Sequence, residues 1–431
     1  MNDYNSNKET GKALIPRLRF PEFQNSGEWG WKRLDELIEE FIEKTKKNFE
    51  FPLLTSSRKG IFFQEEYFND RKVASKNNIG YNIIPEGYIT YRSMSDDGNF
   101  YFNVNNICEK GMISPAYPVF KAIENKVVSY FLLLKLNEGK EVKAFITSNT
   151  QGSTRKALQL TTLKKLKLLI PSLPEQQKIA SCLSSIDEVI AGERQRLELL
   201  RAHKKGLLQN LFPREGETVP KLRFPEFKDS GEWEEKIIGE IGETINGLTN
   251  KSANDFGKGS PFITYLQVYE DSMVNLDKCS FVNIELNEKQ NTIHKGDILI
   301  TTSSETPDEV GFASVMLNEP AQDTYLNSFC FCLRPHKKAN LLPEFSRYLF
   351  RSNLYRKQIN KIAQGITRFN LSKQSFLKVL LLIPPLPEQQ KIADCLSSLD
   401  ELINAQQQKI ELLEQYKKGF LQGLFPNVYA I

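Results

Sequence analysis

Apolar residues recur at alternating intervals of three and four along two segments of the chain, which is the heptad spacing of coiled-coil helices. The first segment begins at Pro174 and ends before Pro213, and the second begins at Pro387 and ends before Pro426. Both begin with Pro-Glu, and a carboxylate near the positive end of a helix favours a start there. Each segment predicts a helix about 57 Å long. The predicted seam residues are Ile179, Leu183, Ile186, Ile190, Leu197, Leu200, Leu207 and Leu211 in the first helix, and Ile392, Leu396, Leu399, Ile403, Ile410, Leu413, Phe420 and Leu424 in the second.

Both helices carry polar residues at matching positions of this seam. Glu193 matches Gln406, and Lys204 matches Lys417. Polar seam residues weaken a coiled coil but fix its register and its partner. The alternative is that the two segments are separate amphipathic core helices. The matched length and the matched interruptions favour pairing of the two helices with each other.

Short β-rich runs and helical runs alternate in residues 30–168 and 234–381. Apolar helical stretches lie at 127–136 and 343–359. This mixture predicts two α+β domains. The β-rich runs read PLLTS, GYITYR and PAYPVF in the first domain, and PFITYLQV, GDILITTS and NSFCFCLRP in the second.

The chain is a tandem duplication. Residues 16–29 read PRLRFPEFQNSGEW and residues 220–233 read PKLRFPEFKDSGEW; residues 170–190 and 383–403 are similarly close. The sequence between these matches has diverged. Each repeat thus joins a near-identical piece to a divergent piece, which indicates a shared role in assembly and separate roles in recognition.

The repeats predict an arrangement with approximate two-fold symmetry. The first helix leaves the first divergent domain and arrives at the second, so the two helices pair most simply in antiparallel orientation, with one domain at each end. The end of the second helix, at Phe425 and Pro426, should then lie near the N-terminal LRFPEF segment. The predicted division is a flexible N-terminus at 1–15, domains at 16–169 and 214–382, and helices at 170–213 and 383–426.

Composition and motifs narrow the class of protein. Hydrophobic residues make up 40% and charged residues 26%, as in soluble globular proteins. The polar N-terminus and the absence of a run of about 20 apolar residues predict a cytoplasmic protein without a membrane segment. The six cysteines form no CxxC pair, and no nucleotide-binding glycine loop or metal-binding motif occurs. We therefore expect no catalytic site, no metal and no cofactor on this chain.

Polar and basic residues follow several predicted strands and are candidates for DNA contact. Arginine reads guanine, Asn and Gln read adenine, and Ser or Thr bind phosphates or base edges. Arg155 and Arg368 lie in matching Gly-Xaa-Thr-Arg segments, so a phosphate contact and a structural salt bridge fit them equally well. The net charge of +4 permits DNA binding without requiring it. The candidates are Ser56, Ser57, Arg58, Lys59, Arg92, Ser93, Thr154, Arg155, Gln267, Thr301, Thr302, Ser303, Ser304, Thr367, Arg368 and Asn370.

This duplicated architecture resembles the specificity subunit of type I restriction–modification enzymes. The resemblance rests on the Ile-Pro-Xaa-Leu-Pro-Glu-Gln-Gln-Lys-Ile-Ala motif at 170–180 and 383–393. The helix after each copy and the Gly-Xaa-Thr-Arg segment before it add to the match. The resemblance covers nearly the whole chain, and two copies in the same order make it specific.

The resemblance implies two target-recognition domains, each of which reads half of a split, asymmetric site on double-stranded DNA. The antiparallel helices would hold the half-sites roughly 34–36 Å apart and would bind two methyltransferase subunits. Restriction/translocase subunits would join the full complex. S-adenosylmethionine, magnesium and ATP would be used by those partners and not by this chain. The target adenine would be flipped into the methyltransferase.

Two other functions are alternatives to DNA recognition within a restriction–modification complex. A DNA-binding scaffold or repressor without enzymatic partners would be well behaved alone, whereas a specificity subunit should expose apolar helix faces and need its partners. A self-contained methyltransferase–nuclease would need a cofactor or nucleotide loop, and the sequence lacks one.

Overall fold

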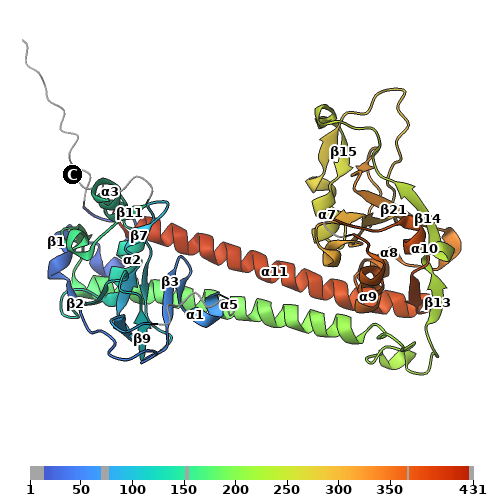
Figure 1. Cartoon of the computed structure of the whole chain (residues 1–431). Helices are drawn as coiled ribbons and strands as arrows, with labels where there is room; N and C mark the ends of the chain where they lie inside the picture. The colour runs from blue at the N-terminus through green and yellow to red at the C-terminus, as the bar shows by residue number, and fades with distance from the viewer. Residues whose placement is uncertain (1–13, 69–76, 151–154, 366–367, 427–431) are drawn as a thin grey trace, which may run out of the picture. The chain divides into compact units, whose positions relative to one another are not determined.

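The computed structural model describes residues 14–68, 77–150, 155–365 and 368–426, and it divides into two compact units. Unit 1 comprises Met1–Arg194 and Gln408–Ile431, and unit 2 comprises Gln195–Gln407. Two long helices, α5 and α11, contribute to both units (Figure 1). Their bounds are Leu173–Asn210 for α5 and Leu386–Leu424 for α11.

Each unit is built around a four-stranded antiparallel sheet, and the two sheets have equivalent strand order. The order is β2-β10-β6-β8 in unit 1 and β14-β21-β17-β19 in unit 2. This agreement confirms the tandem duplication within the divergent regions, where the sequence match is weak. The strands are β2 (Ile38–Phe41), β10 (Val119–Ala122), β6 (Ile89–Tyr91), β8 (Phe102–Val104), β14 (Gly242–Asn246), β21 (Cys330–Pro335), β17 (Ile298–Thr301) and β19 (Ala313–Val315).

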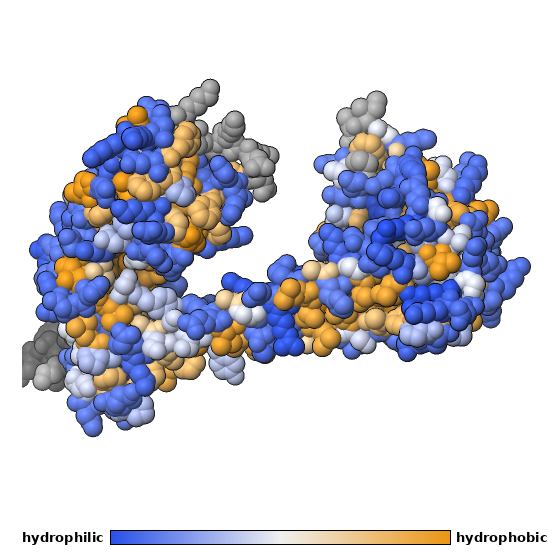
Figure 2. All heavy atoms as spheres, turned by 90° about the horizontal axis from the view of Figure 1, so that it is seen from below, coloured by the Kyte–Doolittle hydropathy of each residue, from blue (hydrophilic) through white to orange (hydrophobic). Residues whose placement is uncertain are grey.

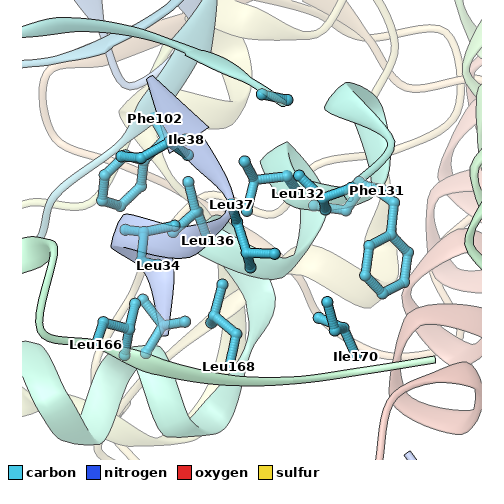
Figure 3. Close-up of a cluster of buried hydrophobic side chains, with 14 of the residues drawn as sticks. Leu34, Leu37, Ile38, Phe102, Phe131, Leu132, Leu136, Leu166, Leu168 and Ile170 are labelled. Carbon is cyan, nitrogen blue, oxygen red and sulfur yellow. The ribbon is translucent and has the colours of Figure 1, made fainter. Parts of the chain in front are cut away.

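The core of unit 1 forms where helix α2 (Ser129–Glu138) covers one side of this sheet. Phe131, Leu132 and Leu136 of α2 pack with apolar side chains from the start of the domain and from the strand that leads into α5 (Figure 3). Their spacing puts them on one face of the helix, so burying that face stabilises the unit. The partners labelled in the figure are Leu34, Leu37, Ile38, Phe102, Leu166, Leu168 and Ile170.

Two predicted elements of unit 2 are divided differently in the structure. The run 343–359 was expected as one helix but forms α8 (Pro343–Leu349) and α9 (Asn353–Ile362), because Ser352 accepts a hydrogen bond from the Tyr355 amide and caps α9. The β-rich run PFITYLQV ends as a strand at Ile263. The side chain of Thr264 then caps a short helix, α7 (Tyr265–Glu270).

Smaller strand pairs also recur in both units. The pair β1–β12 of unit 1 corresponds to β13–β23 of unit 2, and β7–β11 corresponds to β18–β22. The units differ in the remaining strands, since unit 1 has a β3–β4 hairpin and a β5–β9 pair, whereas unit 2 has a three-stranded sheet of β16, β15 and β20. The bounds are β1 (Gly30–Arg33), β12 (Lys167–Ile170), β13 (Glu234–Ile237), β23 (Leu380–Ile383), β7 (Met94–Ser95), β11 (Lys156–Ala157), β18 (Ser303–Ser304), β22 (Phe369–Asn370), β3 (Leu54–Ser57), β4 (Gly60–Phe63), β5 (Asn82–Pro85), β9 (Lys110–Ile113), β15 (Phe256–Ile263), β16 (Ser280–Val282) and β20 (Tyr325–Leu326).

The two long helices lie side by side in antiparallel orientation (Figure 1). In unit 1, Asp187 of α5 pairs with Lys417 of α11 at 2.5 Å, and Glu193 pairs with Lys409. Residues later in α5 therefore pair with residues earlier in α11, which shows that the two helices are antiparallel. In unit 2, Arg201 of α5 binds Gln407 of α11 and Lys204 binds Asp400, so the same relation holds there.

The polar seam positions Lys204 and Lys417 thus pair across the helices with matching aspartates. Lys204 binds Asp400, and Asp400 also accepts a hydrogen bond from Tyr348 of α8 at 2.8 Å. In unit 1, Tyr130 of α2 donates to Asp187 in the same way. Each aspartate therefore ties both long helices to the sheet domain of its unit.

Most predicted seam residues are buried or half-buried. Ile179, Leu183, Ile190, Leu197, Leu211, Ile392, Leu396, Leu399, Ile410 and Leu424 are buried. Ile186, Leu200, Leu207, Ile403 and Leu413 are half-buried. Phe420 differs from the others, since its side chain is 39% exposed.

The near-identical motifs meet at one buried cluster in each unit. In unit 1, Glu175 in the first turn of α5 accepts two hydrogen bonds from Arg19, at 2.8 and 2.7 Å, and one from the indole of Trp29 at 3.2 Å. The side chains of Arg19 and Glu175 are only 6% and 1% exposed. A carboxylate buried in this way needs these donors, because an unpaired buried charge is costly.

Unit 2 repeats this cluster with matching residues. Arg223 binds Glu388 at 2.8 and 2.7 Å, and the Trp233 indole donates to Glu388 at 3.3 Å. The hydrogen bonds that Arg223 donates to the Glu388 carboxylate raise the pKa of Arg223. The Arg-Phe-Pro-Glu-Phe and Gly-Glu-Trp segments are therefore similar in both repeats because each supplies partners to a buried helix-start glutamate.

The end of α11 lies against the N-terminal motif, as the symmetry predicted. The Leu18 amide donates to the Gly423 carbonyl at 2.8 Å, and the Phe425 ring packs edge-on against Trp29 at a centroid distance of 6.4 Å. In unit 2, the Leu222 amide donates in the same way to Asn210 near the end of α5. Each N-terminal motif therefore closes on the helix that arrives from the other repeat.

Candidate nucleic-acid interface

Unit 1 has a hollow of about 770 Å³ that brings together several predicted DNA contacts. It is lined by Arg58 and Lys59 at the tip of the β3–β4 hairpin and by Arg92 at the end of β6. The strand β3 also contributes Ser56 and Ser57, and exposed aromatic residues such as Tyr101 complete the wall. Cationic and aromatic side chains around one concavity suit a nucleic-acid ligand.

Two of the predicted arginines are paired with aspartates that line this hollow and that were not predicted as DNA contacts. Arg58 donates to Asp97 at 2.5 Å, and Arg155 donates to Asp96 at 2.8 Å. For Arg155 the structure therefore contains the salt bridge that was one of the two open interpretations. Carboxylates carry no direct signal for DNA binding, so the run Ser-Asp-Asp after Arg92 gave no reason to include them.

Unit 2 gathers a different set of predicted residues around Phe329. The Thr302 hydroxyl donates to the Phe329 carbonyl at 2.8 Å, and the guanidinium of Arg368 lies over the Phe329 ring at 5.4 Å. The β18–β22 pairing places Ser303 opposite Asn370. The Phe329 side chain is 51% exposed, and it also borders a second hollow, of about 760 Å³.

Three of the predicted contacts in unit 2 are corrected by their burial. Gln267 lies inside the unit and donates to the Asn275 carbonyl at 3.0 Å, because it belongs to helix α7 and not to a strand. Thr301 is buried and donates to a backbone carbonyl, and Ser304 is buried and donates to Glu309. These side chains support the backbone of the face and do not form its surface.

The remaining candidates fall into two groups. Ser56 is buried and accepts from Asn103 at 2.8 Å, and the backbone of Ser93 is tied to Ala116 and Leu158. Thr154 and Thr367 lie outside the described residues. The exposed basic residues of the prediction thus remain the best placed to reach a ligand.

Both long helices expose apolar residues at matching positions of the repeats. Val189 corresponds to Leu402 and Leu199 corresponds to Leu412, and all four are about half exposed. Figure 2 shows hydrophobic residues among hydrophilic ones on the surface of these helices. An apolar face that recurs in both repeats is typical of a protein–protein contact.

No helix in the described part of the chain is long and apolar enough to cross a membrane. The described residues also contain no group of three or more His, Cys, Asp or Glu side chains placed to hold a metal ion.

Comparisons with known proteins agree with this architecture. The model of the type I restriction modification DNA specificity domain matches the chain twice, at residues 26–202 and 230–415. The putative type I restriction enzyme MjaX specificity subunit of Methanocaldococcus jannaschii is 26% identical over 318 residues, which is 70% of this chain and 68% of that protein. The MjaVIII specificity subunit of the same organism is 26% identical over 337 residues, 73% of this chain and 74% of its own length.

Solved structures show the same fold. The S subunit of a type I restriction-modification system from M. genitalium has a TM-score of 0.54 and 16% identity, and the match covers 96% of this chain and all of that one. A chain from a structure of type I R-M complex assembly has a TM-score of 0.55 and 17% identity, over 93% and 98% of the two chains. The two specificity domains cover most of the residues, and the chain belongs to the family of type I restriction–modification DNA specificity proteins.

Proposed function

We propose that this chain is the DNA-recognition subunit of a type I restriction–modification complex and that each unit reads one half of a bipartite, asymmetric site. The observation that carries the proposal is the contrast within the duplication. The buried clusters of Glu175 and Glu388 are the same in both units, whereas the residues around the hollow of unit 1 and around Phe329 of unit 2 differ. Two units with the same buried clusters but different exposed residues suit two different half-sites.

The chain acts by binding and leaves the chemistry to its partners. Two methyltransferase subunits bind the long helices, and restriction/translocase subunits join the complex that cleaves DNA in the cytoplasm. S-adenosylmethionine, magnesium and ATP belong to those subunits. The exposed apolar residues Val189, Leu199, Leu402 and Leu412 support two matching docking surfaces, because burying them against a partner removes apolar area from water.

Phosphate contacts position the protein on DNA, and base contacts select the sequence. The flexible, exposed side chain of Lys59 suits a phosphate, since ammonium acts as a point charge. Arg58 and Arg368 can donate to base edges, because each lies on an exposed face beside an aromatic ring. The long helices set the distance between the half-sites.

Co-expression with the adenine methyltransferase subunit of the same host, followed by mapping of methylated bases across the genome, tests the proposal. We expect one split motif with two short specified halves around a fixed gap. The alternative, an orphan DNA-binding scaffold or repressor, predicts no methylation and no co-purifying methyltransferase. A methyltransferase that modifies an unsplit motif with or without this chain also contradicts the proposal.

A length change in the helices tests their role as a spacer. One heptad inserted into both α5 and α11 keeps the seam in phase and adds about 10 Å, or about three base pairs of B-DNA. We expect a longer gap in the methylated motif with both halves retained. An unchanged gap would contradict the spacer role.

A further inference from the structure

Arg58 lies at the tip of the β3–β4 hairpin with its guanidinium fixed from two sides. Its Nη2 donates to the Asp97 carboxylate at 2.5 Å, and its Cζ lies 5.7 Å from the centroid of the Tyr101 ring. The side chain is 65% exposed and lines the hollow of unit 1. Ion pairs on a surface are usually mobile, because holding two long side chains costs rotamer entropy. The Arg58–Asp97 pair differs from such mobile pairs because Asp97 has a short side chain that is itself held by hydrogen bonds.

Asp97 is held by hydrogen bonds from its own loop. Asn99 donates to it through its side chain at 2.9 Å and through its backbone amide at 3.1 Å, and the Ser95 hydroxyl donates at 2.8 Å. These hydrogen bonds, with that from the Asn99 side chain first, lower the pKa of Asp97 well below its usual value. The carboxylate is therefore charged and fixed at neutral pH, and it can orient a guanidinium.

The remaining donors of Arg58 point to a particular ligand. An arginine has five N–H groups, and among the described residues only the Nη2 group of Arg58 donates a hydrogen bond, to Asp97. A phosphate brought to this guanidinium would also approach the Asp97 carboxylate, and the two negative charges would repel each other. The major-groove edge of guanine carries two neutral acceptors, N7 and O6, which match a fixed pair of arginine donors. A base edge therefore fits this site better than a phosphate.

We propose that Arg58 reads a guanine in the half-site bound by unit 1 and that Asp97 is the positioning residue that orients it. The inference rests on the proposed DNA-recognition function and adds a residue and a base to it. Tyr101 completes the support, since its ring limits the rotation of the guanidinium plane.

Two nearby cations, Arg155 and Lys59, provide matched controls. Arg155 also pairs with an aspartate, but the Asp96 side chain is 63% exposed, against 39% for Asp97. No hydrogen bond from Ser or Asn to Asp96 is found among the described residues, so Arg155 is not oriented in the same way. Lys59 follows Arg58 directly and carries the same charge without a planar donor pair.

Selection of bound duplexes from a pool with randomised positions tests the inference, with the full chain in complex with its host's methyltransferase subunit. The wild-type complex should select a two-part site. Arg58→Lys keeps the charge but loses the paired donors, so the preference for guanine at one position of one half should fall about 10- to 100-fold. The other half-site and the binding to unrelated duplexes should stay unchanged.

Asp97→Asn should relax the same position while leaving the affinity for unrelated duplexes equal or higher, because a negative charge has been removed. A merely structural aspartate would instead weaken binding to every duplex. Lys59→Gln should weaken binding to all sequences evenly and reduce the salt slope by about 1. Arg155→Lys should leave every base preference unchanged.

The outcomes distinguish a failure of the proposed function from a failure of the roles proposed for Arg58 and Asp97. If the wild-type complex selects no split site, the proposed function fails and the inference fails with it. If a split site is selected but Arg58→Lys changes no position, the reading of guanine by Arg58 is overturned while the function stands. If Arg58→Lys relaxes one position but Asp97→Asn lowers binding to all duplexes equally, the positioning role of Asp97 is overturned.

Discussion

The buried clusters at the starts of α5 and α11 and the exposed faces of the two units have diverged to very different degrees. Glu175 and Glu388 bind an arginine and a tryptophan at nearly the same distances. On the exposed side, a hairpin with Arg58 in unit 1 contrasts with a three-stranded sheet and Phe329 in unit 2. Contacts that hold the fold tolerate little change, whereas an exposed face can change without loss of stability.

The buried framework itself contains one asymmetry. In unit 1, Lys135 and Glu141 form an ion pair at 2.6 Å with both side chains fully buried, and Lys135 also lies 5.0 Å from the centroid of the Phe425 ring. Burial lowers the pKa of Lys135. The corresponding helices of unit 2, α8 and α9, pack with the buried aromatic residues Phe350 and Tyr355. The clusters of Glu175 and Glu388 therefore occur in both units, whereas a fully buried lysine–glutamate pair is found in unit 1 alone among the described residues.

The largest expected effect comes from the shared clusters. Glu175→Ala leaves Arg19 buried without its partner and should lower the free energy of unfolding of unit 1 by about 3–5 kcal/mol. Glu388→Ala should do the same to unit 2. Hydrogen exchange read separately for the two units measures both. The exposed pair of Glu22 with Lys178 is the control, since Glu22→Ala should change stability far less than Glu175→Ala. Equal small effects at Glu22 and Glu175 would contradict a shared buried framework.

The asymmetric pair of unit 1 should give a smaller effect that can be reversed. Glu141→Leu alone should destabilise unit 1 by about 3 kcal/mol, because Lys135 loses its buried partner. The double change Lys135→Met with Glu141→Leu should restore most of that loss, since apolar residues of similar size need no partner. Hydrogen exchange of α2 and α3 (Lys140–Asn149) during thermal unfolding measures the stability of unit 1 in each variant. A double variant as unstable as the single one would show that the ion pair is needed for packing.

The aspartates that tie the long helices together should give the smallest effect. A double-mutant cycle of Lys204→Met and Asp400→Asn should show a coupling of about 1 kcal/mol, and the matching cycle of Lys417→Met and Asp187→Asn should be similar. Asp400→Asn alone should cost more than Asp187→Asn, because Asp400 also binds Arg347 at 3.1 Å. Zero coupling in both cycles would mean that these seam positions do not fix the register.

The sequence was most informative where its pattern repeats. The heptads predicted both long helices to within a few residues, and the duplicated motifs predicted that Phe425 would lie near the first motif. The buried role of Glu175 could not be predicted from its neighbours, since its partners lie about 150 residues earlier in the chain. Local rules placed a carboxylate at a positive helix end, but the ion pair depends on tertiary packing.

The exposed faces were harder to predict for two physical reasons. Burial depends on the neighbouring elements, so Gln267 and Thr301 resembled surface residues although they lie in the core of unit 2. Asp97 was not predicted because acidic residues repel DNA, and the sequence gives no sign that its carboxylate accepts a hydrogen bond from Arg58. The basic candidates Arg58, Lys59, Arg92 and Arg368 are exposed, because long cationic side chains are rarely buried, and their contact with DNA stays a prediction.

Replacement of residues 30–168 by the corresponding domain of another specificity protein tests the central claim most directly. The chimaera is co-expressed with the methyltransferase subunit, and the methylated motif is mapped. We expect one half of the motif to change while the other half and the gap are retained. A change in both halves, or in neither, would contradict two independent reading domains on a shared framework.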